Sequence, residues 1–206
     1  MLTSSDDSSL VVDRLCDQTN GQNTAISCFY LDFAARKEQS ATNVLGSMLK
    51  QMLGGMERIP GDISRVFQQQ KTTIGGRRPQ LVNIVKMLQC ITSSRQTFMC
   101  LDALDECAGA ERLKLLDSLK EILDQSPETR IFVTGRPYIR AEIASRLVGQ
   151  VISVSVKSSP GDITTFLRFR LDHDETPDAM DESLEAGILD KIPKGMSEMY
   201  VKAIML

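Results

Sequence analysis

The sequence has no tryptophan, a single histidine (His173), and aromatic residues at only 5% of its 206 positions. None of its five cysteines forms a C-x-x-C pair, and one histidine cannot complete a ligand set, so a zinc site is not expected. No apolar run reaches the roughly 18 residues that a membrane-spanning helix needs. The start, MLTSSDDSS, lacks the basic and apolar regions of a secretion signal. We therefore expect a cytoplasmic domain without a membrane partner.

An excess of basic charge is also missing, because 24 lysines and arginines stand against 27 acidic residues and the net charge is −3. Without a dense basic patch, nucleic acid is not an expected partner. The chain does have what a folded core needs: 42% of its residues are hydrophobic, and a chain of this length can bury a core without disulfides. Cys28 and Cys100 lie inside apolar runs, so we expect small buried hydrophobes in a reducing compartment.

Short apolar runs alternate with stretches of helical periodicity. The apolar runs predict strands at 27–33, 98–101, 130–134 and 151–156. Apolar residues at helical spacing predict helices that begin after Ser40 and after Pro60, and further helices at 80–91, 111–123 and 138–147. Strands separated by helices are typical of βαβ units, which predicts a parallel sheet.

The two ends of the chain differ from this pattern. Residues 1–9 are polar and predict a disordered start, followed by the tail of a helix at 9–15. Residues 162–171 and the stretch from 181 onward predict a small helical appendage. Within the helix at 111–123, we interpret Glu111, Arg112 and Lys114 as a solvated face.

Three acidic residues follow the apolar run at 98–101: Asp102, Asp105 and Glu106, in the string FMCLDALDEC. Ligands of parallel α/β sheets bind at the carboxyl ends of the strands. There, one carboxylate can hold magnesium, and another can orient or deprotonate the water that attacks a phosphate. The alternative is structural, with Asp102 as a strand-end residue and the other two acids at the start of the next helix.

An arginine lies just beyond the next predicted strand, in the string RIFVTGRP. Arg136 stands two residues after Thr134 and could bind a γ-phosphate through charge-assisted hydrogen bonds, while Pro137 can start a helix. The alternative is a surface turn with a solvated arginine. The single helix between the two motifs has the length of a βαβ crossover, which favours a shared site.

Taken together and in this order, four segments resemble the NACHT-type NTPase module of STAND signalling proteins, above all fungal NOD-like receptors and the nephrocystin-3-like N-terminal domain. These segments are 27–53, FMCLDALDEC at 98–107, RIFVTGRP at 130–137 and DITTFLRFRL at 162–171. The resemblance implies an α/β fold with a three-layer parallel sheet of the P-loop NTPase type.

The resemblance also implies roles for the four site residues. Asp102 would be the magnesium-linked acid, Asp105 and Glu106 the pair that supports hydrolysis, and Arg136 the sensor arginine that binds nucleotide. The implied ligands are Mg²⁺ and ATP or GTP. The family usually has T-S-R-P or S-S-R-P where this chain has Thr134-Gly135-Arg136-Pro137. The change to glycine leaves the arginine in place.

The main departure is the phosphate-binding loop. The family places a strand and a G-x-x-x-x-G-K-[ST] loop just before the helix at 9–15, and no such motif occurs in this sequence. That strand is central in the family's sheet, so we expect a sheet without its first, central strand. Its two neighbours would then close up or keep unsatisfied edges. The expected domains are a polar start with a helix remnant (1–20), an incomplete NTPase core (21–158), and the start of a helical or winged-helix segment (159–206).

Three functions stay open at this point. The chain can be the nucleotide-dependent switch module of a signalling NTPase, truncated before its phosphate-binding loop and unable by itself to bind or hydrolyse nucleotide. It can instead be a non-enzymatic protein-interaction remnant, or a truncated gene product that acts on full-length relatives. The third reading is a plain α/β structural domain. Expected partners are nucleotide in the family, other proteins, or a second copy.

Overall fold

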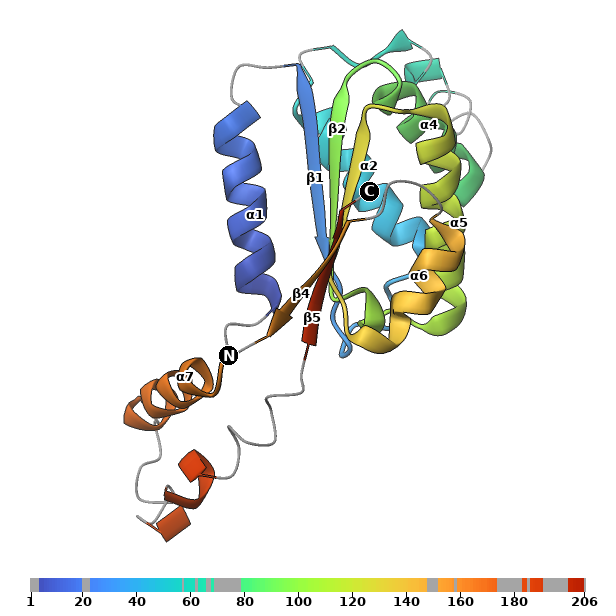
Figure 1. The fold of residues 1–206 in the computed structure, drawn as a ribbon. Coiled ribbons are helices and arrows are strands. Elements are labelled where there is room, and N and C mark those ends of the chain that lie inside the picture. Colours follow the sequence, from blue (N-terminus) through green and yellow to red (C-terminus); the bar gives the residue numbers. More distant parts are fainter. Residues whose placement is uncertain are drawn as a thin grey trace.

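The computed structural model describes residues 4–19, 23–56, 58–61, 63–65, 68, 79–147, 152–157, 159–173, 183–184, 186–190 and 200–205. These residues form a mixed sheet with helices on both of its faces (Figure 1). The strands are β1 (Thr24–Tyr30), β2 (Gln96–Asp102), β3 (Thr129–Val133), β4 (Ile152–Lys157) and β5 (Tyr200–Met205). The helices are α1 (Ser4–Thr19), α2 (Ala41–Gly54), α4 (Leu81–Thr92), α5 (Gly109–Gln125), α6 (Arg140–Arg146) and α7 (Pro160–Asp172). Two short 3₁₀ turns, η1 (Leu104–Glu106) and η2 (Pro137–Ile139), follow β2 and β3.

The sheet has the strand order β1-β2-β3-β5-β4. β1 pairs with β2, and β2 with β3, in parallel, which confirms the predicted parallel α/β core. β5 is antiparallel to both β3 and β4, its neighbours on either side. The sheet is therefore continuous through all five strands and has no gap between β3 and β4.

The C-terminal region differs from the prediction of a purely helical appendage. Residues 183–184 and 186–190 are helical, and α7 covers the predicted helix at 162–171, with a capping box between Ser159 and Asp162. The segment 200–205, however, is a strand and returns to the sheet. Its hydrogen bonds with β3 and β4 decide its structure, because a short apolar run alone does not distinguish a strand from a helix.

The N-terminal prediction also needs a correction. The sequence predicts a disordered start at 1–9, but residues 4–9 form the first turns of α1, which continues to Thr19, and residues 1–3 lie outside the described residues. The polar start SSDD is compatible with this, because hydroxyl and acidic residues are favourable at a helix N-terminus. After Pro60, residues 61, 63–65 and 68 are helical, and the other residues of the helix predicted there lie outside the described residues.

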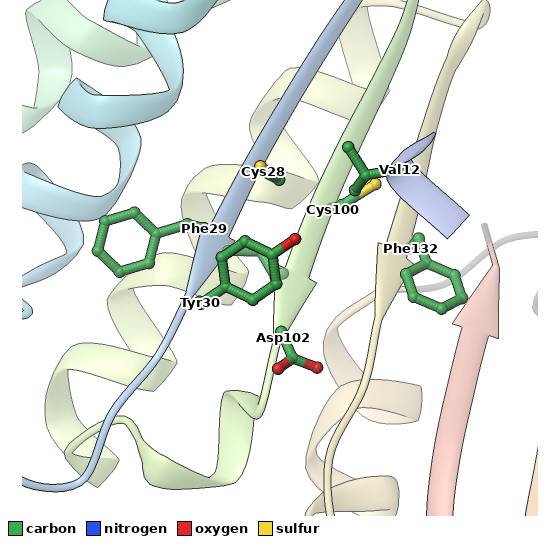
Figure 2. Close-up of a pocket in the computed structure, with 8 residues that line it drawn as sticks. Val12, Cys28, Phe29, Tyr30, Cys100, Asp102 and Phe132 are labelled. Carbon is green, nitrogen blue, oxygen red and sulfur yellow. The ribbon is translucent and has the colours of Figure 1, made fainter. Parts of the chain in front are cut away.

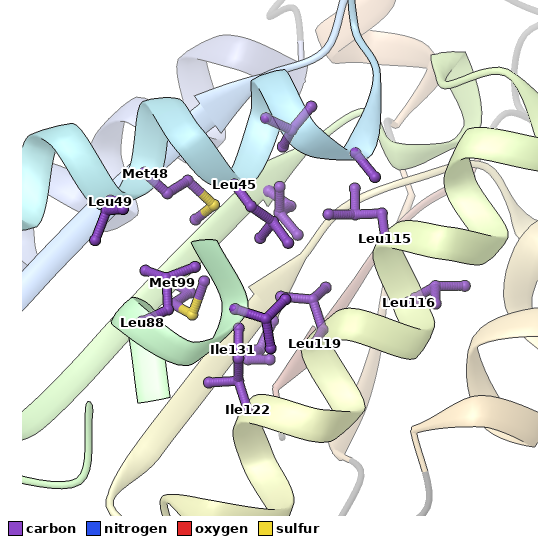
Figure 3. Close-up of a cluster of buried hydrophobic side chains, with 14 of the residues drawn as sticks. Leu45, Met48, Leu49, Leu88, Met99, Leu115, Leu116, Leu119, Ile122 and Ile131 are labelled. Atoms are coloured by element: carbon purple, nitrogen blue, oxygen red, sulfur yellow. The ribbon is translucent and has the colours of Figure 1, made fainter. Parts of the chain in front are cut away.

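The main core lies between the sheet and the helices α2, α4 and α5 (Figure 3). Apolar positions at helical spacing turn toward the sheet, and Ser40 caps α2 with its hydroxyl, which accepts the Asn43 N–H. Fully burying one such aliphatic side chain stabilises the fold by about 1.5–3 kcal/mol. Side chains with no more than 1% exposure include Leu45, Met48, Leu88, Met99, Leu101, Leu115, Leu116, Leu119, Ile122 and Ile131.

The opposite face of the sheet is covered in part by α1, which contacts β1 and β2 (Figure 1). Side chains on this face include Cys28 and Cys100, which are partners in the β1–β2 register. Cys100 is buried, as its apolar surroundings predicted, whereas Cys28 is only half-buried. In the described part of the chain, no helix combines the length and apolarity needed to cross a membrane.

Candidate functional site

The carboxylate of Asp102 lies at the carboxyl end of β2 and is only 3% exposed. The Thr134 hydroxyl donates a hydrogen bond to Asp102 Oδ1 and accepts the Ala103 N–H at 2.8 Å. The backbone of Thr134 adds two bonds, to the Leu101 carbonyl and from the Leu104 N–H, both at 2.9 Å. Thr134 thus fastens the end of β3 to the end of β2 and fixes one oxygen of the Asp102 carboxylate.

Directly after Asp102, the backbone turns through a left-handed residue. Ala103 has φ 53° and ψ 46°, and it is the one non-glycine residue with positive φ in the described part of the chain. A side chain with a Cβ costs roughly 1–2 kcal/mol in this conformation. The turn leads straight into η1, where Asp105 and Glu106 lie.

Asp105 is held by the loop that follows β3. Its Oδ1 accepts the Arg136 N–H at 3.1 Å, and its Oδ2 lies 3.4 Å from Arg136 Nε. Its carbonyl accepts the Tyr138 hydroxyl at 3.3 Å. The side chain of Asp105 is 5% exposed, whereas that of Arg136 is 61% exposed. Solvent around Arg136 therefore weakens the attraction between the two charges.

Glu106 has a different partner. Its Oε2 accepts the N–H of Phe33, in the loop after β1, at 2.9 Å. The same loop is fixed by the Gln39 side chain, whose Oε1 accepts the Asp32 N–H at 3.2 Å. Glu106 therefore joins the loops after β1 and β2, whereas Asp105 is the acid that contacts Arg136.

Arg112 was missed as a site-supporting residue, and the prediction of a solvated face for it is wrong. Its guanidinium makes a bidentate ion pair with Glu142 of α6, at 2.8 and 3.0 Å, and its side chain is 12% exposed. It also donates to the Cys107 carbonyl at 3.0 Å and to the Asp105 carbonyl at 3.5 Å. The hydrogen bond with Glu142 raises the pKa of Arg112. No local pattern indicates this, because Glu142 is remote in the sequence.

The neighbouring Glu111 is also engaged. Its carboxylate accepts the Ala41 N–H at the start of α2, at 3.0 Å, and the Lys114 ammonium at 2.6 Å. The hydrogen bond from Lys114, and after it the one from Ala41, lowers the pKa of Glu111. Of the three residues predicted to be solvated, only Lys114 has a largely exposed side chain.

A small cleft adjoins Asp102 on the face of the sheet that α1 covers (Figure 2). It is a shallow depression that does not enclose even one water molecule, whereas typical ligand pockets have volumes of about 300–1,000 Å³. Apart from the Asp102 carboxylate, the wall offers only a phenol and two thiols as polar side-chain groups and has no cationic residue. The lining residues are Val12, Cys28, Phe29, Tyr30, Cys100, Leu101, Asp102 and Phe132.

These surroundings do not fit a magnesium-bound nucleotide. A triphosphate needs backbone N–H donors and cationic side chains around its oxygens, and none of the residues that line the cleft is cationic. No group of three or more His, Cys, Asp or Glu side chains that could hold a metal ion occurs among the described residues. The thiols are poor ligands as well, because burial raises the pKa of Cys100 to about 12 and also raises that of Cys28.

The structure therefore places the four predicted residues as follows. All four lie at the carboxyl ends of β2 and β3, as predicted from the chain order of the motifs. Asp105 is in contact with Arg136, Asp102 is tied to the same loop through Thr134, and Glu106 faces the loop after β1. Their carboxylates bind groups of the chain itself.

Comparison with known proteins supports the family resemblance. The family model described as "Nephrocystin 3, N-terminal" matches residues 7–136. The match begins in α1 and ends at Arg136, so it includes β1, β2, β3 and all four candidate residues. Neither a curated protein nor a solved structure matches the chain at a significant level. Since the family model covers well over half of the sequence, the chain belongs to the nephrocystin 3 N-terminal family.

Proposed function

We propose that this chain is part of the switch module of a NACHT-type signalling NTPase, of the kind found in fungal NOD-like receptors, and that by itself it binds and hydrolyses nucleotide negligibly. The family match over residues 7–136 supports the first half of the proposal. In a complete module, Asp102 would coordinate the magnesium ion, and Asp105 and Glu106 would support hydrolysis. Arg136 would bind the γ-phosphate.

The second half of the proposal rests on one observation. Every acidic residue of the site has a partner from the chain itself: Asp102 binds the Thr134 hydroxyl, Asp105 binds Arg136, and Glu106 binds the Phe33 N–H. Asp105 already neutralises part of the Arg136 charge, and no residue that lines the cleft beside Asp102 is cationic. The sequence supplies no G-x-x-x-x-G-K-[ST] loop to hold the other phosphates.

Thermal unfolding with and without Mg²⁺ and millimolar ATP or GTP tests the proposal. A ligand at 100 times its dissociation constant adds about 2.7 kcal/mol to the free energy of unfolding, and we expect no measurable shift. We also expect no phosphate release above the level of the Asp102→Asn variant, which keeps the shape of the side chain. Asp124→Ala, at an exposed position on α5, is the matched control for a lost surface carboxylate. Magnesium-dependent turnover that Asp102→Asn abolishes and Asp124→Ala keeps would refute the proposal.

A second candidate is a non-enzymatic protein-interaction role. It is favoured by the apolar side chains that β4 exposes, since Ile152 is 59% and Val154 is 50% exposed. Exposed apolar side chains that lie next to each other on one strand are more typical of contact surfaces than isolated ones. Replacing both by threonine would lower binding to a partner and leave the unfolding temperature of the core nearly unchanged.

A further inference from the structure

Exposed aromatic and basic side chains gather at the turn after β3, although the acids behind them are buried. Tyr138 lies in η2 and is 65% exposed, and it is flanked by the exposed residues Arg136 and Arg140. The stretch 134–141 contains no acidic residue, and the next acid along the chain, Glu142, is bound in an ion pair. The outer surface of this turn is therefore cationic and aromatic.

Both arginines of the turn have donors to offer. Arg136 Nε lies 3.4 Å from Asp105 Oδ2, which is longer than the 2.7–2.9 Å of a charge-assisted hydrogen bond, and the Arg136 side chain is 61% exposed. Arg140 forms no ion pair with any residue that the structure describes. A guanidinium carries five N–H donors in a planar fork, so the two side chains can bind further acceptors.

The turn is held rigidly from below. The Tyr138 hydroxyl donates to the Asp105 carbonyl at 3.3 Å, and the Arg136 N–H donates to Asp105 Oδ1 at 3.1 Å. Between the two arginines, Ile139 is only 2% exposed and packs in the main core. A surface that is already ordered loses less conformational freedom when it binds a partner, which favours binding.

A second exposed aromatic ring lies at the same edge of the sheet, on the loop after β1. Phe33 is 66% exposed, its N–H is held by Glu106, and the Arg36 guanidinium lies 5.5 Å from its ring centroid. Phe33 follows the last residue of β1 by three positions, as Arg136 follows the last residue of β3. β1 and β3 are separated by β2 alone, so their ends lie about 10 Å apart. Three residues of an extended peptide span that distance.

We propose that the turn at 136–140 is a docking surface for an extended acidic segment of a protein partner. Carboxylates of that segment bind the guanidinium groups of Arg136 and Arg140, and an apolar side chain three residues away contacts Phe33. Guanidinium and carboxylate groups can form two parallel hydrogen bonds, which gives the contact a defined geometry. Arginine and tyrosine are also enriched among the residues that contribute most to protein interfaces. The inference does not depend on whether the chain binds nucleotide.

A protein segment fits this surface better than a nucleic acid does. Single-stranded nucleic acid needs a basic groove that follows several phosphates in succession. Here the two arginines are followed toward β1 by the exposed acids Asp32 and Glu38, which flank Phe33 in the sequence, and the chain has a net charge of −3. These acids would repel further phosphates but not an apolar side chain.

Fluorescence anisotropy with short labelled peptides tests the surface. Two peptides carry a pair of glutamates with a leucine three residues before or after it, and otherwise glycine and serine. We expect saturable binding of at least one of them below about 1 mM. The same peptides with glutamine in place of glutamate should not bind. Binding should weaken as the salt concentration rises, because salt screens exposed charges.

Variants of the protein locate the binding site. Arg136→Gln and Arg140→Gln should each weaken binding about tenfold, as expected for the loss of a charge-assisted hydrogen bond, and Phe33→Ala should weaken it less. Arg14→Gln removes the same charge from an exposed position on α1 and should leave binding unchanged. Because Arg136→Gln also removes the partner of Asp105, a second test uses Arg140→Glu, which should bind a lysine version of the peptide better than the glutamate version. Unfolding temperatures show whether each variant is folded.

Four results would overturn the proposal. The first is the absence of saturable binding below about 1 mM, and the second is equal binding of the glutamate and glutamine peptides. The third is a loss of binding in Arg14→Gln as large as in Arg140→Gln. The fourth is tighter binding of a single-stranded oligonucleotide or of inorganic triphosphate than of the acidic peptide, which would assign the arginines to phosphate instead.

Discussion

The Thr134 hydroxyl lies between the Asp102 carboxylate and the Ala103 N–H, at the point where the chain turns left-handed. The Thr134 side chain thus forms hydrogen bonds both with a buried carboxylate and with a peptide N–H in a strained turn. The sequence alone does not indicate that an aspartate and a threonine at two strand ends interact. In the structure, the Asp102 carboxylate accepts a hydrogen bond from the Thr134 hydroxyl.

Thr134→Val should therefore destabilise the protein by about 1–3 kcal/mol, because it leaves the Ala103 N–H without its acceptor and removes one donor from Asp102. Thr134→Ser, which keeps the hydroxyl, should cost less. Urea unfolding of the two variants measures the difference. Equal stabilities of Thr134→Val and the unchanged protein would show that water replaces the hydroxyl at this site.

Gly135 is packed closely, so a change toward the serine that the family usually has is not neutral here. A Cβ at this position would lie 2.6 Å from Ile139 Cδ1 and 3.3 Å from Asp105 Oδ1. Overpacking of this kind costs roughly 1–3 kcal/mol. Replacing glycine by alanine also lowers the conformational entropy of the unfolded chain, which offsets part of this cost. We expect Gly135→Ala to lower the free energy of unfolding by about 1 kcal/mol. Its cost should fall in an Ile139→Val background, which a double-mutant cycle measures; additive costs would mean that Ile139 is not the obstacle.

The sequence was sufficient to locate the four candidate residues, because apolar runs mark the ends of β2 and β3 and parallel strands share one carboxyl edge. It could not show what those residues bind. The contact of Glu106 with the Phe33 N–H joins residues that are far apart in the chain, and so does the pair between Arg112 and Glu142. Such partners follow from the packing of α5 against α6 and of one loop against another, which no local pattern encodes.

Among the secondary-structure elements, β1 has an unusual neighbour along its open edge. The Gln51 side chain of α2 accepts the Cys28 N–H at 2.9 Å and donates to the Cys28 carbonyl at 2.8 Å. One amide side chain thereby replaces a backbone partner on the outer strand of the sheet. The Gln51 amide satisfies the Cys28 N–H and C=O groups in the middle of the open edge of β1, where another chain could otherwise pair.

Gln51→Ala should cost about 1 kcal/mol, the typical net contribution of a hydrogen bond that water can partly replace. The more specific effect is local: the amide of Cys28 should exchange its hydrogen faster, while the amides that pair β1 with β2 keep their protection. Hydrogen exchange measured by NMR distinguishes the two sets. Lys50→Ala, at the exposed neighbouring position of α2, is the matched control and should leave Cys28 unaffected.

The elements that sequence patterns predicted well are those with strong local signals. β1, β2 and β3 follow from their apolar runs, and α2 follows from its periodicity and its Ser40 cap. β5 was missed because the short string YVKAIM carries no period of its own. The open edges of β3 and β4 determine its conformation, and that information lies elsewhere in the chain.

For the molecule as a whole, two titrating groups should limit stability at opposite ends of the pH range. The pKa of Glu111 is lowered in the folded state, so its contribution is present above the usual glutamate range and is lost as the pH falls through the folded value. Burial raises the pKa of Cys100 to about 12, so the folded thiol stays neutral while the unfolded one ionises above about 8.5. The free energy of unfolding should fall on both sides of a plateau.

Urea unfolding between about pH 3 and about pH 10 measures this profile, which spans the ordinary glutamate and thiol values. Glu111→Gln should be less stable than the unchanged protein at neutral pH and should approach it in acid. Cys100→Ala should flatten the alkaline side, whatever its effect on stability at neutral pH. If Glu111→Gln kept the same deficit at all pH values, the carboxylate charge would not be the cause.

The position of β5 in the sequence has a consequence for the order of events during synthesis. Among the described strands, β4 pairs with β5 alone, and Tyr200 follows Lys157 by 43 residues (200 − 157). At the usual 5–20 residues per second, roughly 2–9 s separate the synthesis of these two residues. β4 therefore has no partner strand in the sheet during that interval, and it can join the core only after β5 has been made.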